Sequence, residues 1–446
     1  MESGIQKKIF KNSLIKDEEK RSILNYYLDL ENRISINSRE NSDQGTPVNF
    51  QLAKKFPRHR WYTYKEGFSP VFVSDFINRF RKSESDVIFD PFGGIGTSVL
   101  EGAMKGYNSY SNDINGLSNY IANIKTANYS EKDLSDIKKA CDEFINNELT
   151  ENASPPDHDT VLNYFDQKVL ENILSIQAWI NNLDSSKTRN LFNLSLITNL
   201  EYFSSHRKDG NGVKRKSNHV PITKLSDTKE ILIKNIELFI KDIESTKISG
   251  NGNILTQSSF DKYELPEKAD LVITSPPYAN CFDYSKVYLV ELWFSGIFKN
   301  KMDQKIFRES SIISHVHYNW DKRHENFGNE FVNSDIYNYL SNKDLWDKKI
   351  PKMVTGYFSD MGKVLTEMSH NLNKGATVGM VVGNSVYAGL PIATDLLITE
   401  MAKDVGYEVE GIEVYRQLNS SPQQMKKLTT EEKKFLRESL IILKWK

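Results

Sequence analysis

Residues 269–280 read ADLVITSPPYAN, an apolar strand pattern that runs directly into Ser275, two prolines and Tyr278. Proline fits neither a central strand nor a helix interior, and it holds the preceding residue extended, so a stiff loop follows the strand. This loop offers a hydroxyl on Ser275, a rigid carbonyl on Pro276 and an aromatic face on Tyr278. In open α/β sheets, ligands bind at the carboxyl ends of strands. The loop therefore predicts a site for a flat, polar molecule.

A second candidate site is the stretch DPFGGIGTS at residues 90–98, between a predicted strand and a predicted helix. Glycine lets the backbone approach a ligand closely, and a helix N-terminus favours negative groups. The stretch lacks the Gly-Lys-Ser/Thr of a phosphate-binding loop. The carboxylate of Asp90 would repel a phosphate and suits an ammonium group. The pattern is also typical of a plain tight turn between strand and helix.

Asp113 ends the next predicted strand, about 20 residues further on, where an acid binds ribose hydroxyls in dinucleotide-binding sheets. The sequence Asp-Ile-Asn-Gly is equally typical of a turn or helix cap. A nucleoside that carries an amino acid would satisfy both acids, with its ammonium at Asp90 and its ribose at Asp113. The pair therefore favours S-adenosylmethionine as a cofactor.

The elements that must position these residues alternate between strand and helix patterns. That order predicts a mostly parallel sheet with helices on both faces. The predicted strands are 86–89, 107–113, 252–261, 269–273, 376–385, 407–418 and 438–446. The predicted helices around them are 71–80, opened by Ser69 as N-cap and Pro70, then 99–106, 284–298, 355–372 and 394–406.

The chain of 446 residues is long enough for two or three structural units. We expect an N-terminal extension at 1–60, charged and partly helical, and a discontinuous catalytic domain at 61–128 plus 251–446. A mostly helical insertion at 129–250 is indicated by apolar spacing at 160–180 and 228–243. Residues 299–350 form an irregular insertion within the catalytic part.

The composition sets limits on the class of protein. A net charge of −1 argues against a uniformly basic polyanion-binding surface, although a local basic groove stays open. Two cysteines, Cys141 and Cys281, form no disulfide framework or usual zinc site. His315 and His317 have no evident third ligand, so no metal is expected. No signal segment or long apolar run is found, and we expect a cytoplasmic protein.

Together the two motifs resemble those of amino-group DNA methyltransferases. DPFGGIGT resembles the cofactor motif DPFxGxGT, and TSPPY is similar to the catalytic motif (D/N/S)PP(Y/W) of that family. The resemblance covers about residues 60–128 and 250–446, and it implies a Rossmann-like methyltransferase fold, S-adenosylmethionine and double-stranded DNA. The cofactor motif precedes the catalytic motif, which excludes the permuted arrangement. The cofactor-binding residues that it implies are Phe68, Ser69, Asp90, Phe92, Gly93, Gly94, Gly96, Thr97, Asp113 and Asp261.

The resemblance implies that the loop at residues 275–280 holds a flipped base, and we call this segment the catalytic loop. Ser275 and the Pro276 carbonyl would accept hydrogen bonds from the exocyclic amine, Pro277 would keep them rigid, and Tyr278 would stack on the base. Serine at the first position points to cytosine N4, whereas aspartate or asparagine is more typical for adenine N6. Carbon-5 methylation needs a cysteine nucleophile, typically in a Pro-Cys sequence, and Cys281 is better explained as a packing residue.

Nucleic acid contacts are expected from two segments. The first is a basic turn with six side chains, which is also the pattern of a solvated surface loop: His206, Arg207, Lys208, Lys214, Arg215 and Lys216. The second is the insertion at 299–350, with HVHYNWDKRHENF, as a candidate for target recognition. A cationic and aromatic cluster at 58–62 fits packing at least as well.

The leading function is a cytosine-N4 DNA methyltransferase, the modification enzyme of a restriction–modification system with a separately encoded endonuclease. Adenine-N6 methylation of DNA is the main alternative. RNA or protein-glutamine methylation and an inactive DNA-binding module are further alternatives. The intact motif residues argue against the inactive module, and the basic turn and long insertions favour DNA.

Overall fold

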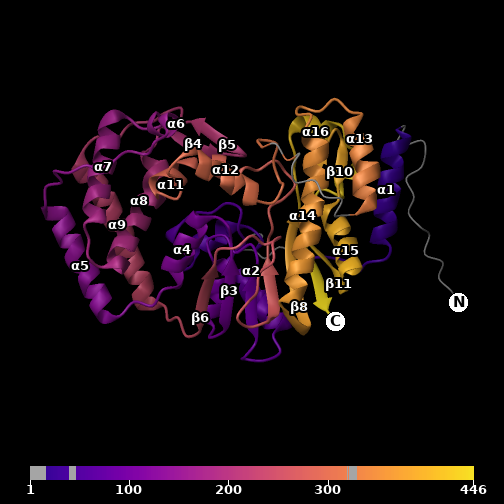
Figure 1. Ribbon diagram of the computed structural model, residues 1–446, viewed down its shortest axis with the longest axis horizontal. Helices are drawn as coiled ribbons and strands as arrows, with labels where there is room; N and C mark the ends of the chain where they lie inside the picture. The colour runs from indigo at the N-terminus through magenta and orange to yellow at the C-terminus, as the bar shows by residue number, and fades with distance from the viewer. Residues whose placement is uncertain (1–16, 40–46, 319, 321–328) are drawn as a thin grey trace.

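The computed structural model describes residues 17–39, 47–318, 320 and 329–446. An eight-stranded sheet lies at its centre, in the order β1-β11-β12-β8-β7-β2-β3-β6 (Figure 1). All its strands run in one direction except β12, which is antiparallel to both neighbours. The strands are β1 (Ile36–Ser38), β2 (Val87–Asp90), β3 (Asn108–Asn112), β6 (Asn251–Leu255), β7 (Ala269–Thr274), β8 (Leu372–Gly383), β11 (Tyr407–Gln417) and β12 (Arg437–Trp445).

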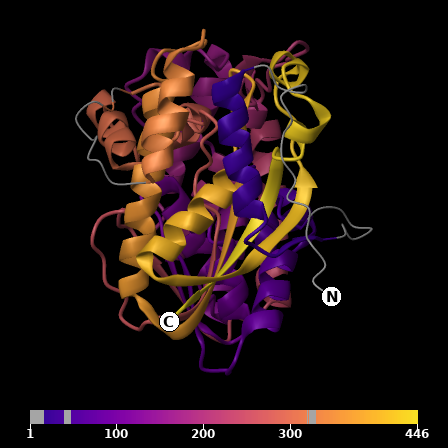
Figure 2. The ribbon, with the colours of Figure 1, turned by 90° about the vertical axis from the view of Figure 1, so that its right-hand side faces the viewer.

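Helices cover both faces of the sheet, as the alternating pattern predicts. Neighbouring strand residues point to opposite cores: Phe89 and Val272 pack under α14 and α15, whereas Ile88 and Leu271 pack under α2. Figure 2 shows α1, α14 and α15 together on one side. The helices against or beside the sheet are α1 (Glu18–Glu31), α2 (Pro70–Phe80), α3 (Thr97–Met104), α4 (Gly116–Thr126), α13 (Tyr337–Ser341), α14 (Ile350–His370) and α15 (Thr394–Val405).

The helical insertion forms a lobe of its own beside the sheet, on the left of Figure 1. Its helices are α5 (Glu131–Asn146), α6 (Asp159–Leu162), α7 (Gln167–Asn181), α8 (Ser186–Phe203) and α9 (Leu225–Ser245). Their apolar core is continuous with Trp61 and with two short helices that follow the catalytic loop, α10 (Tyr284–Val287) and α11 (Leu289–Phe294). The lobe therefore packs directly against α10 and α11, which follow the catalytic loop in the sequence.

The remaining elements are short. They are η1 (Phe50–Lys55), η2 (His59–Trp61), the hairpin β4 (His206–Asp209) and β5 (Gly212–Arg215), α12 (Lys301–Ser310), η3 (Val332–Ile336), the hairpin β9 (Ser385–Tyr387) and β10 (Leu390–Ile392), α16 (Pro422–Lys426) and α17 (Thr430–Lys433). Among the described residues, no helix combines the length and the apolar content that crossing a membrane requires.

Most predicted elements are confirmed, and Ser69 does cap α2, accepting from the Phe72 N–H at 3.4 Å. Three predictions are wrong in detail. The helix expected at 284–298 breaks at Tyr288, whose φ of −101° and ψ of 23° leave the helical region. The strand expected to reach residue 261 ends at Leu255. The basic turn is an ordered hairpin, β4–β5, with four paired residues on each strand.

Two segments hold structure that the sequence pattern does not predict. The three-residue strand β1 pairs in parallel with β11 at the edge of the sheet. The insertion at 299–350 contains the helix α12, which begins at a capping box formed by Asn300 and Asp303. Part of the HVHYNWDKRHENF stretch, at 319 and 321–328, lies outside the described residues.

Candidate active site

A cavity opens at the edge of the sheet where β2, β3 and β7 end, and we call it the first cavity. Its empty space, counted together with the open solvent at its mouth, is about 930 Å³. Parallel strands bring their carboxyl ends to one edge of the sheet. The stretch at 90–98, which we call the glycine loop, therefore meets the catalytic loop there although the two are far apart in sequence. Of the predicted site residues, the first cavity is lined by Phe68, Asp90, Phe92, Gly93, Gly94, Thr97, Asp113, Ser275 and Pro277.

The glycine loop is shaped by two close approaches of its backbone. A Cβ atom on Gly93 would lie 1.7 Å from Ser111 Oγ on β3, so no larger residue fits there. Gly96 has a left-handed φ of 79°, and a Cβ atom on it would lie 2.7 Å from the Ala122 Cβ. Gly96 is the N-cap of α3 and offers no side-chain cap to the first N–H groups of that helix. Thr97, the first helical residue, lines the cavity, so a negative group can bind there.

Asp90 and Asp113 place two carboxylates in the first cavity. Asp90 accepts from the Phe92 N–H at 3.1 Å and from Ser98 Oγ at 2.7 Å. Asp113 accepts from the Gly94 N–H at 2.9 Å and the Asn115 N–H at 2.7 Å, so it caps the turn and also lines the cavity. Burial raises the pKa of each carboxyl to about 6, against the opposing effect of these hydrogen bonds.

The catalytic loop separates the first cavity from a second one. Ser275 and Pro277 line the first cavity, whereas Pro276 and Tyr278 line the second. The empty space of the second cavity, counted together with the open solvent at its mouth, is about 630 Å³. The Tyr278 ring packs so closely on Gly383 that a Cβ atom there would lie 2.6 Å from it. The Tyr278 hydroxyl donates to Glu438 Oε1 at 3.0 Å. Burial and this carboxylate raise the pKa of Tyr278 well above its ordinary value.

Three predicted cofactor residues do not line the first cavity. Ser69 is fully buried, where it caps α2 and donates to the Pro47 carbonyl at 2.8 Å. Gly96 acts through the backbone turn alone. Asp261 is exposed, and Ser259 and Phe260 line the cavity in its place, because β6 ends earlier than predicted.

Several lining residues were missed by sequence reasoning, and the most distinctive is Glu66. It lines both cavities, as do Gly67 and Tyr284. Its carboxylate accepts a hydrogen bond from the Tyr288 hydroxyl, and burial raises its pKa to about 7. Around it, Tyr64 stacks on Tyr288 with ring centroids 5.2 Å apart. The one available signal was a single acid within the basic and aromatic run at 55–68.

The insertion at 299–350 also contributes to the first cavity. Its lining residues are Phe307, Ser310, Ser311, Ile312, Ser314 and His315. This segment therefore lies against the predicted cofactor site, in addition to any role it has in reading a target sequence.

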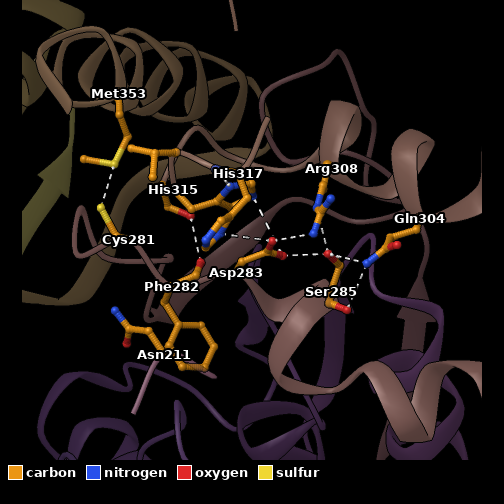
Figure 3. A network of polar contacts seen from close by, with 12 residues as sticks. Asn211, Cys281, Phe282, Asp283, Ser285, Gln304, Arg308, His315, His317 and Met353 are labelled. Atoms are coloured by element: carbon orange, nitrogen blue, oxygen red, sulfur yellow. Dashed lines mark hydrogen bonds and ion pairs between the residues drawn. The ribbon is translucent and has the colours of Figure 1, made fainter. Parts of the chain in front are cut away.

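A buried polar network ties this insertion to the catalytic loop, and Figure 3 shows Asp283 at its centre. Asp283 accepts from the Arg308 guanidinium at 2.7 Å and from Ser285 Oγ at 2.6 Å, and His317 Nδ1 lies 3.4 Å away. Burial opposes the charge of Asp283, but these partners outweigh burial, so its pKa lies below the ordinary value. The network connects α12 to Asp283 and Ser285, in the segment that follows the Pro-Pro-Tyr sequence.

The same network supplies the third side chain that sequence reasoning did not find beside His315 and His317. The ligand atoms of Asp283 and the two histidines lie within 4.8 Å of one another. However, the Asp283 carboxylate is already paired with Arg308, and His315 Nδ1 accepts the His317 backbone N–H at 3.2 Å. That bond places the His315 proton on Nε2, so the arrangement fits a hydrogen-bonded network better than a metal centre.

Only some of the cationic side chains of the basic hairpin are exposed and available to a ligand. Lys208 is 9% exposed and pairs with Glu201 at 3.1 Å and with Glu291. Lys216 donates to three carbonyls at the end of α8, and His206 stacks on Tyr164 at 4.0 Å. The hairpin cations that stay exposed are Arg207, Lys214 and Arg215.

The tip of this hairpin touches the catalytic loop. Asn211 Nδ2 donates to the Asn280 carbonyl at 2.9 Å, two residues beyond Tyr278. Lys65 Nζ donates to the Lys208 carbonyl at 3.1 Å from the other side. The hairpin therefore lies beside the second cavity, whose lining includes both Lys65 and Asn280.

Two further candidates prove to be packing residues. Cys281 is buried beside Tyr387 and Met353, and burial raises the pKa of its thiol to about 11, which keeps it protonated. In the cluster at 58–62, Trp61 is 1% exposed and donates to Asp242 at 2.9 Å. Neither residue is placed to act on a ligand.

The mostly parallel sheet with a ligand-sized cavity at its carboxyl edge places the chain among α/β proteins of the methyltransferase fold. No family model matches the chain. It is 29% identical to type II methyltransferase M.BsoBI of Geobacillus stearothermophilus, over 85% of this chain and 84% of that protein. Type II methyltransferase M.AvaI of Anabaena variabilis is 26% identical, over 82% of each chain. Type II methyltransferase M.MvaI of Kocuria varians is 25% identical, over 77% of this chain and 81% of that protein. The chain is thus similar over most of its length to three type II methyltransferases.

Proposed function

We propose that the chain is a site-specific DNA methyltransferase that transfers a methyl group from S-adenosylmethionine to the N4 amine of a flipped cytosine. The observation that carries this proposal is the position of the catalytic loop between two cavities. Ser275 lines the cavity of the glycine loop, and Tyr278 lines the neighbouring one. A methyl donor in the first cavity and a base in the second would meet at this loop.

The residues of the first cavity fit S-adenosylmethionine. The uncapped N-terminus of α3 suits the carboxylate of the methionine part, and Asp90 suits its ammonium group. Asp113 keeps lone pairs free after accepting two N–H groups, and these suit ribose hydroxyls. Phe68, Phe92 and Phe260 provide apolar surface for the adenine.

S-adenosylmethionine would supply a methyl group on its sulfonium sulfur. The chain's own residues must then hold the amine in line and increase its nucleophilicity, because its lone pair is delocalised into the ring. The Ser275 hydroxyl and the Pro276 carbonyl accept hydrogen bonds from the amine and favour tetrahedral geometry at nitrogen. Pro276 and Pro277 keep both acceptors rigid, so little reorganisation accompanies transfer. Tyr278 holds the base by stacking.

The choice of cytosine N4 is supported by Ser275 at the first position of the catalytic motif. Carbon-5 methylation is disfavoured because Cys281 is buried and its thiol stays protonated. Adenine-N6 transfer uses the same loop geometry and is the second candidate.

We further propose double-stranded DNA as the substrate and a restriction–modification system as the setting, with a separately encoded endonuclease. The type II designation of the relatives supports this proposal. Within the chain, the exposed cations Arg207, Lys214 and Arg215 lie on a hairpin whose tip contacts the catalytic loop. We assign DNA contact to that hairpin, within the insertion at 129–250, and target recognition to it and to residues 299–350.

The test is to express the gene in a host that lacks DNA methylation and to sequence the methylated bases. Digested DNA is analysed in parallel by mass spectrometry of the nucleosides. We expect N4-methylcytosine at one short recognition sequence, and less complete methylation of that sequence with the Ser275→Ala variant. N6-methyladenine would replace the base assignment and keep the mechanism, whereas 5-methylcytosine would contradict the mechanism. No methylated base of any kind would contradict a role on DNA.

A further inference from the structure

The second cavity is built from the sheet as well as from the catalytic loop. Besides Pro276 and Tyr278, it is lined by Arg416 at the end of β11 and Glu438 at the start of β12. These two residues lie directly opposite each other on the antiparallel pair. A register shift between Val414 and Arg416 interrupts the pairing just before them. Such bulges commonly redirect a side chain next to an active site.

Glu438 holds two of the residues that line this cavity. Its side chain is 5% exposed, its Oε1 accepts from the Tyr278 hydroxyl at 3.0 Å, and its Oε2 accepts from Arg416 Nε at 2.6 Å. One buried carboxylate thus fixes the aromatic ring and the guanidinium relative to each other. Because each of its oxygens holds one of these neighbours, Glu438 acts as a positioning residue for them.

Arg416 keeps donors free for a ligand. Its Nε is used by Glu438, and within the described part of the chain no other acceptor contacts its guanidinium. The side chain is 38% exposed. Its two terminal amino groups therefore remain available beside the Tyr278 ring, held in a fixed planar fork.

We propose that Arg416 recognises the target cytosine by donating hydrogen bonds to N3 and O2 of the base. This inference rests on the proposed function and deepens it. On a cytosine, the N4 amine, N3 and O2 follow one another along one edge. A base that lies on Tyr278 with N4 at Ser275 presents the two remaining acceptors as a pair, which matches a guanidinium fork. Adenine offers N1 but has a C–H group in place of O2, so one donor would stay unpaired.

The surroundings favour a base over a backbone phosphate as the ligand of Arg416. Guanidinium groups bind phosphate equally well in general. Here, however, the Glu438 carboxylate lines the same cavity and would repel a phosphate, and Tyr278 and Pro276 give the cavity a flat apolar side. The other cation of the lining, Lys65, donates to the Lys208 carbonyl. A neutral ring with an acceptor edge suits this combination.

The test uses duplexes that carry the recognition sequence found by methylome sequencing. One duplex has cytosine at the target position, and the other has 3-deazacytosine, which keeps the amine and O2 but replaces N3 by C–H. Single-turnover methyl transfer is measured for the unchanged protein and for Arg416→Ala, and the ratio of the two rates is compared between proteins. This comparison cancels the intrinsic reactivity of the analogue, as in a double-mutant cycle.

We expect Arg416→Ala to slow transfer to cytosine by about 10- to 100-fold and to abolish the discrimination between the two duplexes. Arg416→Lys keeps the charge beside Glu438 but loses the fork, so it should also lose the discrimination, and it remains informative if the alanine variant does not fold. The matched control is Arg39→Ala. Arg39 has the same 38% exposure and an Nε–carboxylate contact of 2.9 Å to Glu413, but it lines neither cavity.

An unchanged ratio in both Arg416 variants would overturn the inference. So would equal weakening of binding to matched and unmatched DNA with a shallower salt dependence, which identifies a phosphate contact. Transfer to adenine by the unchanged protein would overturn it too. If the unchanged protein methylates no DNA, the proposed function itself has failed, and that result is distinct from a functional enzyme whose Arg416 variants discriminate normally.

Discussion

The glycine loop at 90–98 and the basic hairpin at 206–216 each concentrate one kind of residue in a short stretch, and the fold uses them differently. In the glycine loop, Gly93 and Gly96 both serve the geometry of one turn, because the backbone passes close to Ser111 and Ala122. In the hairpin, the cations separate into two groups. Lys208, Lys216 and His206 are held by partners within the protein, and three others stay exposed.

The difference shows which features a short sequence can reveal. A glycine acts through its own backbone, so its pattern is interpretable locally. The availability of a charge depends on partners far away in sequence: Lys208 pairs with Glu291, on a helix that follows the catalytic loop. The hairpin is therefore partly a structural element that connects the insertion to the active site.

Lys208→Ala tests whether the hairpin has this structural role. The substitution leaves Glu291, 3% exposed, without its cation, and loss of one partner of a buried pair typically costs about 3–5 kcal/mol. We expect the free energy of unfolding to fall by about that amount in urea denaturation. Lys214→Ala, at a side chain that is 65% exposed, should change it by less than about 0.5 kcal/mol. Equal effects would contradict the division of the hairpin into two groups.

Ser275→Ala tests whether the catalytic loop serves methyl transfer while the glycine loop serves cofactor binding. Removing one preorganised polar contact should lower the methyl-transfer rate by about 10²–10³. The affinity for S-adenosylmethionine should stay near that of the unchanged protein, because the glycine loop and Asp113 hold the cofactor. Single-turnover transfer and isothermal titration separate the two quantities. A variant that loses cofactor affinity instead would assign Ser275 to the cofactor site.

Asp113→Asn tests the glycine-loop side of the first cavity. A carboxylate that accepts hydrogen bonds contributes about 1.5–3 kcal/mol, so the dissociation constant for S-adenosylmethionine should rise accordingly. Asp261→Ala is the control, because Asp261 is exposed and does not line the cavity. If Asp261→Ala loses more affinity for S-adenosylmethionine than Asp113→Asn does, the sequence-based prediction that Asp261 binds the cofactor is supported.

The pH dependence of cofactor binding gives a further test of this cavity. Burial raises the pKa of Asp113 and Asp90 to about 6, so both are ionised above pH 6 and become protonated below it. A protonated carboxyl accepts hydrogen bonds less well and loses its attraction for an ammonium group. Cofactor affinity should therefore fall as the pH decreases through about 6. Asp113→Asn should remove part of this dependence, and Asp90 accounts for what remains; a flat profile in the unchanged protein would contradict both assignments.

The sheet was predictable because its strands carry strong local patterns. β2 and β7 are short apolar runs bounded by turn residues, and Gly406, with φ of 114°, ends α15 as its sequence indicates. Edge and polar strands carry no such pattern. β1 has three residues, and β4 and β5 consist mostly of charged and polar residues, so hydrophobic alternation could not identify them.

The candidate site divides in the same way. Asp90, Asp113 and the Pro-Pro-Tyr sequence line the two cavities, and the sequence indicated their position because each lies at the end of a recognisable strand. Asp261 lies outside the first cavity because β6 ends at Leu255, six residues before the predicted end at 261. Glu66, Arg416 and Glu438 carry no local motif. Arg416 and Glu438 reach the second cavity through the pairing of β11 with β12, and Glu66 reaches it from the loop before α2.

The smallest expected effect concerns the exposed part of the hairpin. Arg207, Lys214 and Arg215 can each neutralise a DNA phosphate, and each lost contact should reduce the slope of log affinity against log salt by about 0.9. The triple alanine variant should therefore bind matched and unmatched duplexes more weakly to the same degree, as fluorescence anisotropy across a salt series would show. Lys234→Ala is the control, since Lys234 is 67% exposed on α9 and pairs with Glu230, away from the hairpin. If the triple variant instead loses only its preference for the matched duplex, with an unchanged slope, these side chains contact bases, and the exposed half of the hairpin reads sequence.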